Sequence, residues 1–155
     1  MAPALSRVRP ARPADLDALV ALEQRAFDGD RLSRAQYRRH LRSASAQVLV
    51  VDADGGALAG AAVVFFRRGS GVARLYSLAT APEARGRGVA TALLRAAGEA
   101  ARGRGCRELR LEVRADNAAA IGLYERHDWR RGGQLVAYYE DGADGWRYAL
   151  PLATG

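Results

Sequence analysis

Residues 82–94, with the sequence PEARGRGVATALL, combine residue types that bind anions. Arginine and glycine alternate from Arg85 to Gly88, and the run that follows has apolar residues at helical spacing. Glycines let the backbone approach a phosphate, because they carry no Cβ. The first N–H groups of a helix lack internal acceptors and carry partial positive charge. The segment therefore predicts an anion site at the start of a helix.

A Gly-rich turn that binds nothing is the alternative interpretation of the same segment. Two better-known phosphate motifs do not fit it. A P-loop is excluded because no Gly-Lys-Ser or Gly-Lys-Thr is present, and the GxGxxG fingerprint fails because Thr91 stands at its third glycine.

A second segment, residues 109–129, places an amide and a phenol on one predicted helix face. Its first five residues alternate apolar and charged side chains, which is typical of a strand. Asp116 and Asn117 follow as helix caps, and the shared face comprises Asn117, Ala120, Ile121 and Tyr124. A face that only packs in a core more often carries Leu or Val at both ends, so these polar groups favour a functional site.

Together, the two segments resemble the GCN5-related N-acetyltransferase (GNAT) family. The run from Arg85 to Ala90 matches the family's R/Q-x-x-G-x-G/A acyl-CoA signature, and LEVRADNAAAIGLYER is similar to a segment of bacterial ribosomal-protein alanine acetyltransferases. The resemblance covers nearly the whole chain. It implies an α/β fold with a central mixed sheet of about seven strands and helices on both faces. Strands 72–80 and 108–113 would be parallel and splay apart to admit the cofactor.

The resemblance also implies acetyl-CoA (CoA) as cosubstrate. Backbone groups at the end of strand 72–80 would hold the pantetheine, and the amides of the Gly-rich turn would hold the pyrophosphate. The residues expected to bind the cofactor are Leu78, Ala79, Thr80, Arg85, Gly86, Arg87, Gly88, Val89, Ala90, Thr91 and Asn117. Simple solvent exposure is the alternative for Arg85 and Arg87, and a capping role alone is the alternative for Asn117.

Tyr124 matches the tyrosine that acts in this family as general acid toward the leaving thiolate. A free phenol has a pKa of about 10 and a thiol about 8.5, so full proton transfer is uphill by roughly 2 kcal/mol. A hydrogen bond that strengthens as the C–S bond breaks is therefore the expected role. A tyrosine that merely packs in the core is the alternative.

Glu112 matches the general base proposed for the ribosomal-protein branch of the family. The attacking amine must be neutral, and a carboxylate could take up its proton through water. The alternative is a salt bridge with Arg110, Arg114 or another arginine.

Tyr138 and Tyr139 are expected to line the acceptor site, in a hairpin where similar tyrosine pairs hold a peptide N-terminus. Ordinary strand aromatics are the alternative. Five acidic residues fall in the two loops expected near the acceptor, where they would attract a cationic amine or simply be solvated: Asp28, Asp30, Glu140, Asp141 and Asp144. The loop FDGDRLS is not typical of the ribosomal branch.

The predicted function is direct acetyl transfer in a ternary complex to a primary amine, with a protein or peptide N-terminus favoured. A small-molecule amine acetyltransferase and a non-catalytic acyl-CoA-binding regulatory module are the alternatives. His40 and His127 lack ligand-like spacing, so no metal is expected.

The elements that must position these residues follow from periodicity and turn signals. Strands are predicted at 6–9, 47–51, 58–67, 72–80, 108–113, 134–139 and 146–150. Helices are predicted at 13–27, 33–42, 89–100 and 117–126. Asp128 replaces a glycine common in the family, so it would have to adopt a left-handed turn.

Composition sets the class of protein. The 155 residues, 49% of them hydrophobic, predict a single domain over 1–155. No apolar run approaches the length of a membrane span, the run MAPALSRVRPARPAD has no secretory apolar core, and Cys106 is the one cysteine. We therefore expect a cytoplasmic protein, either a monomer or a homodimer, without a membrane partner.

Net charge is +7, and all 24 basic residues are arginines. Because they are scattered among many alanines and glycines, we interpret them mainly as compositional bias and expect no nucleic-acid partner. Nucleic-acid binding would need a contiguous basic face and an affinity that falls steeply with salt.

Overall fold

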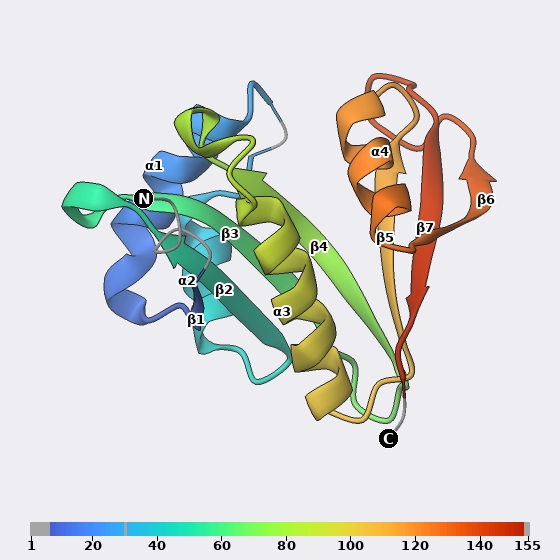
Figure 1. Cartoon of the computed structure of the whole chain (residues 1–155), viewed down its shortest axis with the longest axis horizontal. Helices are drawn as coiled ribbons and strands as arrows, with labels where there is room; N and C mark the ends of the chain where they lie inside the picture. The colour runs from blue at the N-terminus through green and yellow to red at the C-terminus, as the bar shows by residue number, and fades with distance from the viewer. Residues whose placement is uncertain (1–6, 30, 154–155) are drawn as a thin grey trace.

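Seven strands form one mixed sheet in the order β1-β2-β3-β4-β5-β7-β6, as seen in a computed structural model that describes residues 7–29 and 31–153 (Figure 1). The strands are β1 (Val8–Pro10), β2 (Ala46–Asp52), β3 (Leu58–Phe65), β4 (Val72–Thr80), β5 (Glu108–Arg114), β6 (Arg130–Leu135) and β7 (Gly145–Pro151). The helices are α1 (Leu16–Ala26), α2 (Arg34–Arg42), α3 (Val89–Gly103) and α4 (Ala118–Arg126). The predicted α/β architecture is confirmed.

β4 and β5 are parallel neighbours that pair over only one end of their length. Their register runs from Val72 opposite Glu108 to Arg74 opposite Arg110, after which the strands diverge. Figure 1 shows the wedge between them, with α3 on one side and α4 on the other. The expected splay is therefore present, and it leaves the edge of β4 beyond Arg74 without a strand partner on that side.

A β-bulge interrupts β4 where the splay begins. Val63 lies opposite Ser77 and Val64 opposite Leu75, so Tyr76 has no partner in β3. A bulge leaves the extra residue outside the ladder and re-aims the side chains around it. The bulge therefore turns part of β4 toward the wedge.

α3 covers one face of the sheet and α1 and α2 cover the other. The buried side of α3 carries the residues Val89, Leu93, Leu94, Ala97 and Ala101. A Cβ on Gly60 of β3 would lie 2.6 Å from Val89 Cγ1 and 2.9 Å from Leu93 Cδ1. Glycine at this position therefore allows the first turn of α3 to lie directly on the sheet.

The structure differs from the sequence prediction in the last hairpin. β6 spans Arg130–Leu135 instead of 134–139, so Tyr138 and Tyr139 lie in the loop that follows it. The register between β6 and β7 shifts between Arg131 and Gln134, across two glycines. Adjacent arginines and glycines have no apolar alternation, so this strand could not be recognised from its pattern.

Smaller differences concern element ends. The predicted first helix begins as a 3-10 turn, Pro13–Asp15, and β3 ends two residues early, at Phe65. Asp128 has φ 68°, as its predicted left-handed conformation requires. Ser6, which the first predicted strand included, lies outside the described residues.

No helix within 7–29 or 31–153 is long and apolar enough to cross a bilayer.

Candidate active site

A cleft of about 1130 Å³ opens where β4 and β5 separate. Its walls come from the α1–α2 connection, the second half of β4, the turn before α3, the end of β5, α4 and the loop after β6. Twelve of the predicted site residues line it: Leu78, Thr80, Arg85, Gly86, Gly88, Val89, Ala90, Thr91, Glu112, Asn117, Tyr124 and Tyr139. Ala79, Arg87 and Tyr138 are the predicted residues that do not line it. Ala79 is buried in the core, whereas Arg87 and Tyr138 are exposed.

The turn before α3 presents a series of free backbone amides. Gly86 has φ 78° and Gly88 has φ 80°, a left-handed conformation that residues with a Cβ rarely adopt. Among the described residues, the N–H groups from Gly86 to Thr91 meet no backbone or side-chain acceptor. Successive amides of this kind at a helix start form an anion-binding concavity. Arg85 and Arg87 flank it with exposed side chains.

α3 and α4 are joined at the rim of this turn. A hydrogen bond of 3.0 Å links Thr91 Oγ1 to His127 Nε2 at the end of α4. Asn117 caps the other end of α4, because its side chain accepts a hydrogen bond from the N–H of Ala120. The cap that the sequence predicted is therefore present, and Asn117 also lines the cleft. His127 had no signal in the sequence beyond its position after the helix.

Tyr124 lies on the wall of the wedge that α4 provides. Its side chain is 8% exposed and packs against the rings of Trp129 and Tyr148, at centroid distances of 5.7 and 6.2 Å. Burial raises the pKa of Tyr124 to about 12, with a smaller contribution from nearby Tyr139. Tyr124 lines the cleft, and its hydroxyl is accessible to solvent and has no hydrogen-bond partner in the described ranges. The site thus contains a neutral, unpaired phenol O–H.

Glu112 lies on β5, on the side of the cleft away from α3. Arg74 of β4 forms a close ion pair with it, and Arg147 of β7, its cross-strand neighbour, places Nε 3.9 Å from Oε2. The side chain is only 10% exposed. The two arginines considered from the sequence have other partners: Arg110 pairs with Glu108, and Arg114 pairs with Asp116 and Asp141.

Tyr139 reaches the cleft from the loop after β6. The Arg114 guanidinium lies 5.1 Å from its ring centroid, and the Tyr138 ring stands nearly perpendicular to it at 5.1 Å. Burial is the main cause that raises the pKa of Tyr139. The loop is held by Asp144, which accepts a hydrogen bond of 2.8 Å from the N–H of Ala137.

The opposite rim is the α1–α2 connection, which contributes Phe27 and Asp28 to the cleft. A buried carboxylate fixes this connection: Glu23 is 1% exposed, and it accepts from the Tyr37 hydroxyl at 2.6 Å and from the Leu32 N–H at 3.1 Å. Of the five acidic residues expected near the acceptor, Asp28 lines the cleft, whereas Asp30 lies outside the described residues.

Several cleft residues were missed by sequence reasoning. Among them are Ala26, Phe27, Tyr76, Arg114 and Arg126. Tyr76 is the bulged residue of β4, and Arg126 is the last residue of α4. Neither a bulge nor the pairing of Glu112 with Arg74 has a signal in a single sequence, since both depend on how distant strands align.

Comparisons with known proteins agree with this geometry. A family model described as "Acetyltransferase (GNAT) family" matches residues 16–129. An N-alpha-acetyltransferase of Saccharolobus solfataricus is 44% identical over 45 residues, which cover 29% of this chain and only 27% of that protein. The structure of the ribosomal-protein-S18-alanine N-acetyltransferase from Escherichia coli has a TM-score of 0.84 and 28% identity, covering 96% of this chain and 95% of that chain. Nourseothricin acetyltransferase has a TM-score of 0.78 and 29% identity, covering 95% and 98%.

Proposed function

This chain belongs to the GNAT family of acetyltransferases, and we propose that it transfers the acetyl group of acetyl-CoA to the free α-amine of a protein or peptide. The observation that carries the proposal is the meeting, in one cleft, of free amides before α3, the unpaired phenol of Tyr124 and the carboxylate of Glu112. The structural likeness to the S18-alanine N-acetyltransferase supports the choice of acceptor.

The residues present fit a CoA molecule. Its diphosphate would lie on the amides from Gly86 to Thr91, where hydrogen bonds to the anion replace those that the protein does not supply. Arg85, Arg87 and Arg126 would add charge around the phosphates. Its pantetheine would follow the unpaired edge of β4, along the backbone of Leu78, Ala79 and Thr80. Acetyl-CoA bound in this way would supply an acetyl thioester within the cleft.

Tyr124 would act as a hydrogen-bond donor to the sulfur. With a pKa of about 12, full proton transfer to a thiolate of pKa about 8.5 is uphill by roughly 5 kcal/mol. Donation of a hydrogen bond that strengthens as charge develops on the sulfur avoids that cost. The absence of a competing acceptor among the described residues keeps the O–H free for this role.

Glu112 would receive the proton that the amine releases, through an intervening water molecule. An α-amine has a pKa near 8 and a lysine amine near 10.4, so the α-amine is far easier to deprotonate at neutral pH. The carboxylates of Glu112 and Asp28 would attract the cationic form to the cleft. Tyr139 would pack against the first residues of the acceptor.

A second candidate acceptor is a small-molecule amine. It is favoured by the likeness to nourseothricin acetyltransferase, whose identity to this chain is 29%. A regulatory module that binds acyl-CoA without turnover is the remaining alternative, and the presence of both Glu112 and Tyr124 in the cleft argues against it.

The test is CoA release from acetyl-CoA with a panel of acceptors, paired with calorimetry of CoA binding. The panel contains peptides with free N-termini, the same peptides N-blocked but carrying lysine, and small amines such as polyamines and aminoglycosides. Turnover confined to free N-termini would support the proposal. Turnover confined to small amines would replace it with the second candidate, and tight CoA binding without any turnover would favour the regulatory module.

A further inference from the structure

Charge in this protein is segregated along the strand direction. The connections at the cleft end of the sheet contain the carboxylates Asp28, Asp54, Glu83, Asp116, Glu140, Asp141 and Asp144. At the far end, the α2–β2, β3–β4 and α3–β5 connections contain no aspartate or glutamate. The β3–β4 and α3–β5 connections contain two arginines each, and the α2–β2 connection directly follows Arg42. Residues 31–51 and 55–82 together hold eight arginines and no acidic residue.

The three far-end connections contact one another. Arg104 donates a hydrogen bond of 2.8 Å to the carbonyl of Ala44, and its guanidinium lies 4.0 Å from the ring centroid of Phe66. The N–H of Phe66 bonds to Ser45, and the N–H of Arg107 bonds to Gly71. The arginines of the β3–β4 and α3–β5 connections therefore lie close together, beside the end of α2.

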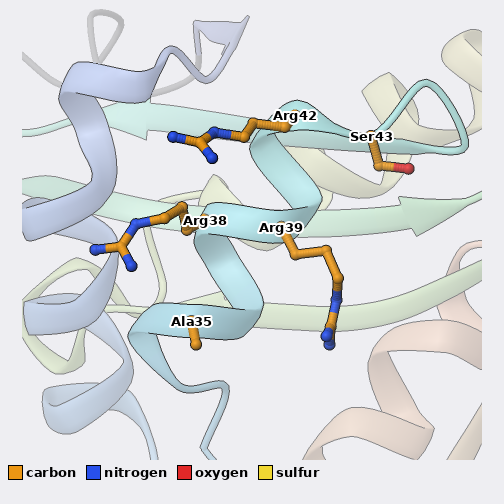
Figure 2. A pocket seen from close by; sticks show the side chains of 5 residues that line it. All are labelled: Ala35, Arg38, Arg39, Arg42 and Ser43. Carbon is orange, nitrogen blue, oxygen red and sulfur yellow. The ribbon is translucent and has the colours of Figure 1, made fainter.

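α2 extends this surface along the side of the molecule. Arg38, Arg39, Arg42 and Ser43 line a shallow depression of about 390 Å³. Figure 2 shows Arg38 and Arg42 extending to one side of the helix and Arg39 to the other. Guanidinium groups that diverge in this way do not converge on a single small ion, but they can contact successive charges of an extended one.

We define the basic end as eight exposed arginines: Arg38, Arg39, Arg42, Arg67, Arg68, Arg102, Arg104 and Arg107. None of them forms an ion pair with a carboxylate of the described residues. Glu99 and Glu108 are the carboxylates in adjoining segments, and Glu108 is already paired with Arg110. The basic end thus carries a large uncompensated positive charge.

Compositional bias accounts for the number of arginines but not for their separation from the acidic residues. The expectation of no nucleic-acid partner rested on arginines scattered along the sequence. Folding brings a third of the 24 together on α2, on the end of α3 and on the adjoining β3–β4 and α3–β5 connections. Nucleic-acid binding requires basic residues grouped in this way.

We propose that the basic end binds the phosphate backbone of a nucleic acid without reading its bases. An array of arginines spread over several elements matches a repeating phosphate charge. α3 has 15 residues, so about 22 Å separates Arg104, which follows the helix, from the turn at its start. None of the eight arginines of the basic end lines the cleft, so the two surfaces are distinct.

The test is binding of a mixed-sequence DNA duplex and an RNA of the same sequence, measured by fluorescence anisotropy between about 50 and about 200 mM salt. Arg42→Gln/Arg67→Gln/Arg102→Gln removes three charges from the basic end. Arg12→Gln/Arg95→Gln/Arg130→Gln removes three exposed charges elsewhere and is the matched control. Turnover of a peptide acceptor is measured for both, and neither variant is expected to change it, because no substituted residue lines the cleft.

The expected result is micromolar binding of both nucleic acids at low salt and a steep log–log salt dependence. The basic-end variant should reduce the salt slope by about 3, because each lost phosphate contact removes about 0.9. The control should change the slope by less than about 1. No binding, an equal loss in both variants, or binding of only one nucleic acid would overturn the proposal. Equally tight binding of polyglutamate would overturn it in favour of an acidic protein partner.

Discussion

Tyr124 has a buried ring, and its hydroxyl is accessible to solvent and has no hydrogen-bond partner among the described residues. An O–H left free in this way is expected to find its partner in the substrate. The raised pKa keeps the phenol protonated, so the group can donate a hydrogen bond but cannot accept a proton.

Tyr124→Phe should lower kcat by about 10²-fold and leave CoA affinity within about twofold, because the hydroxyl would act on developing charge and the ring packing is kept. Steady-state kinetics and calorimetry check this. Tyr148→Phe is the matched control, since it removes a neighbouring hydroxyl that bonds to Glu125 and does not line the cleft. An unchanged kcat in Tyr124→Phe would refute the donor role.

Variants of Glu112 and Arg74 distinguish two roles for the Glu112 carboxylate, that of proton acceptor and that of ion-pair partner. If Glu112 takes up the proton of the amine, Glu112→Gln should lower kcat/KM by about 10²-fold below about pH 8 and by much less above it, where the amine is already neutral. Arg74→Gln breaks the ion pair but keeps the Glu112 carboxylate, so its kcat/KM should fall far less. Equal losses in the two variants at every pH would show that Glu112 serves the ion pair only.

At the scale of single residues, sequence reasoning could find Tyr124, Glu112 and the glycines of the turn, because local motifs carry them. It could not find the arginine partners of Glu112. Those partners depend on the register of β5 with β4 and β7, which a single sequence does not encode in any local pattern.

At the scale of elements, the turn before α3 is central to the proposed function, because its free amides would hold the phosphates of CoA. Gly88→Trp should abolish CoA binding, because the indole would occupy the space in front of the free amides. Gly69→Trp is the matched control: Gly69 has φ 77°, open space around it and a place in the β3–β4 connection. Both variants should lose about 1–2 kcal/mol of stability from the left-handed backbone. Normal CoA affinity in Gly88→Trp, measured by calorimetry, would mean that the phosphates bind elsewhere.

The α1–α2 connection is fixed by Glu23, and this makes its stability depend on pH. Burial raises the pKa of Glu23, so the protonated form is favoured in the folded state. The stability that Glu23 contributes is then fully present below its ordinary pKa of 4.5 and declines as the pH rises through the raised value.

Glu23→Gln should cost roughly 1–3 kcal/mol of unfolding free energy, because one of the two donors loses its acceptor. Urea denaturation of the protein and the variant near pH 5 and pH 8 measures this cost. The difference between them should be larger at the lower pH. A difference that grows as the pH rises would contradict the direction of the pKa shift.

Elements with strong periodicity were predictable. The central strands, the capping box of α2 and the cap of α4 follow from apolar alternation and polar caps in the sequence. β6 was not predictable, because Arg-Arg-Gly-Gly has neither apolar alternation nor β-branched side chains. Tyr138 and Tyr139 were consequently predicted in a strand, whereas they lie in a loop. The bulge at Tyr76 was also not predictable, since it exists only relative to β3.

At the scale of the whole molecule, the two ends of the sheet differ in chemistry. The divergence of β4 and β5 opens the cleft at one end, where the carboxylates gather, and the basic end lies where the same strands pair. Net charge alone, +7, describes neither end. The fold separates the acidic residues from the basic ones, so the number of arginines in the sequence does not indicate where a basic surface lies.

The central claim is that this cleft acetylates a free α-amine. It is tested most directly with one peptide that carries both a free N-terminus and an internal lysine, incubated with acetyl-CoA and analysed by tandem mass spectrometry, with Tyr124→Phe in parallel. We predict acetyl on the α-amine and not on the lysine, formed about 10²-fold more slowly by the variant. Acetyl on the lysine, or no acetylated peptide at all, would contradict the account.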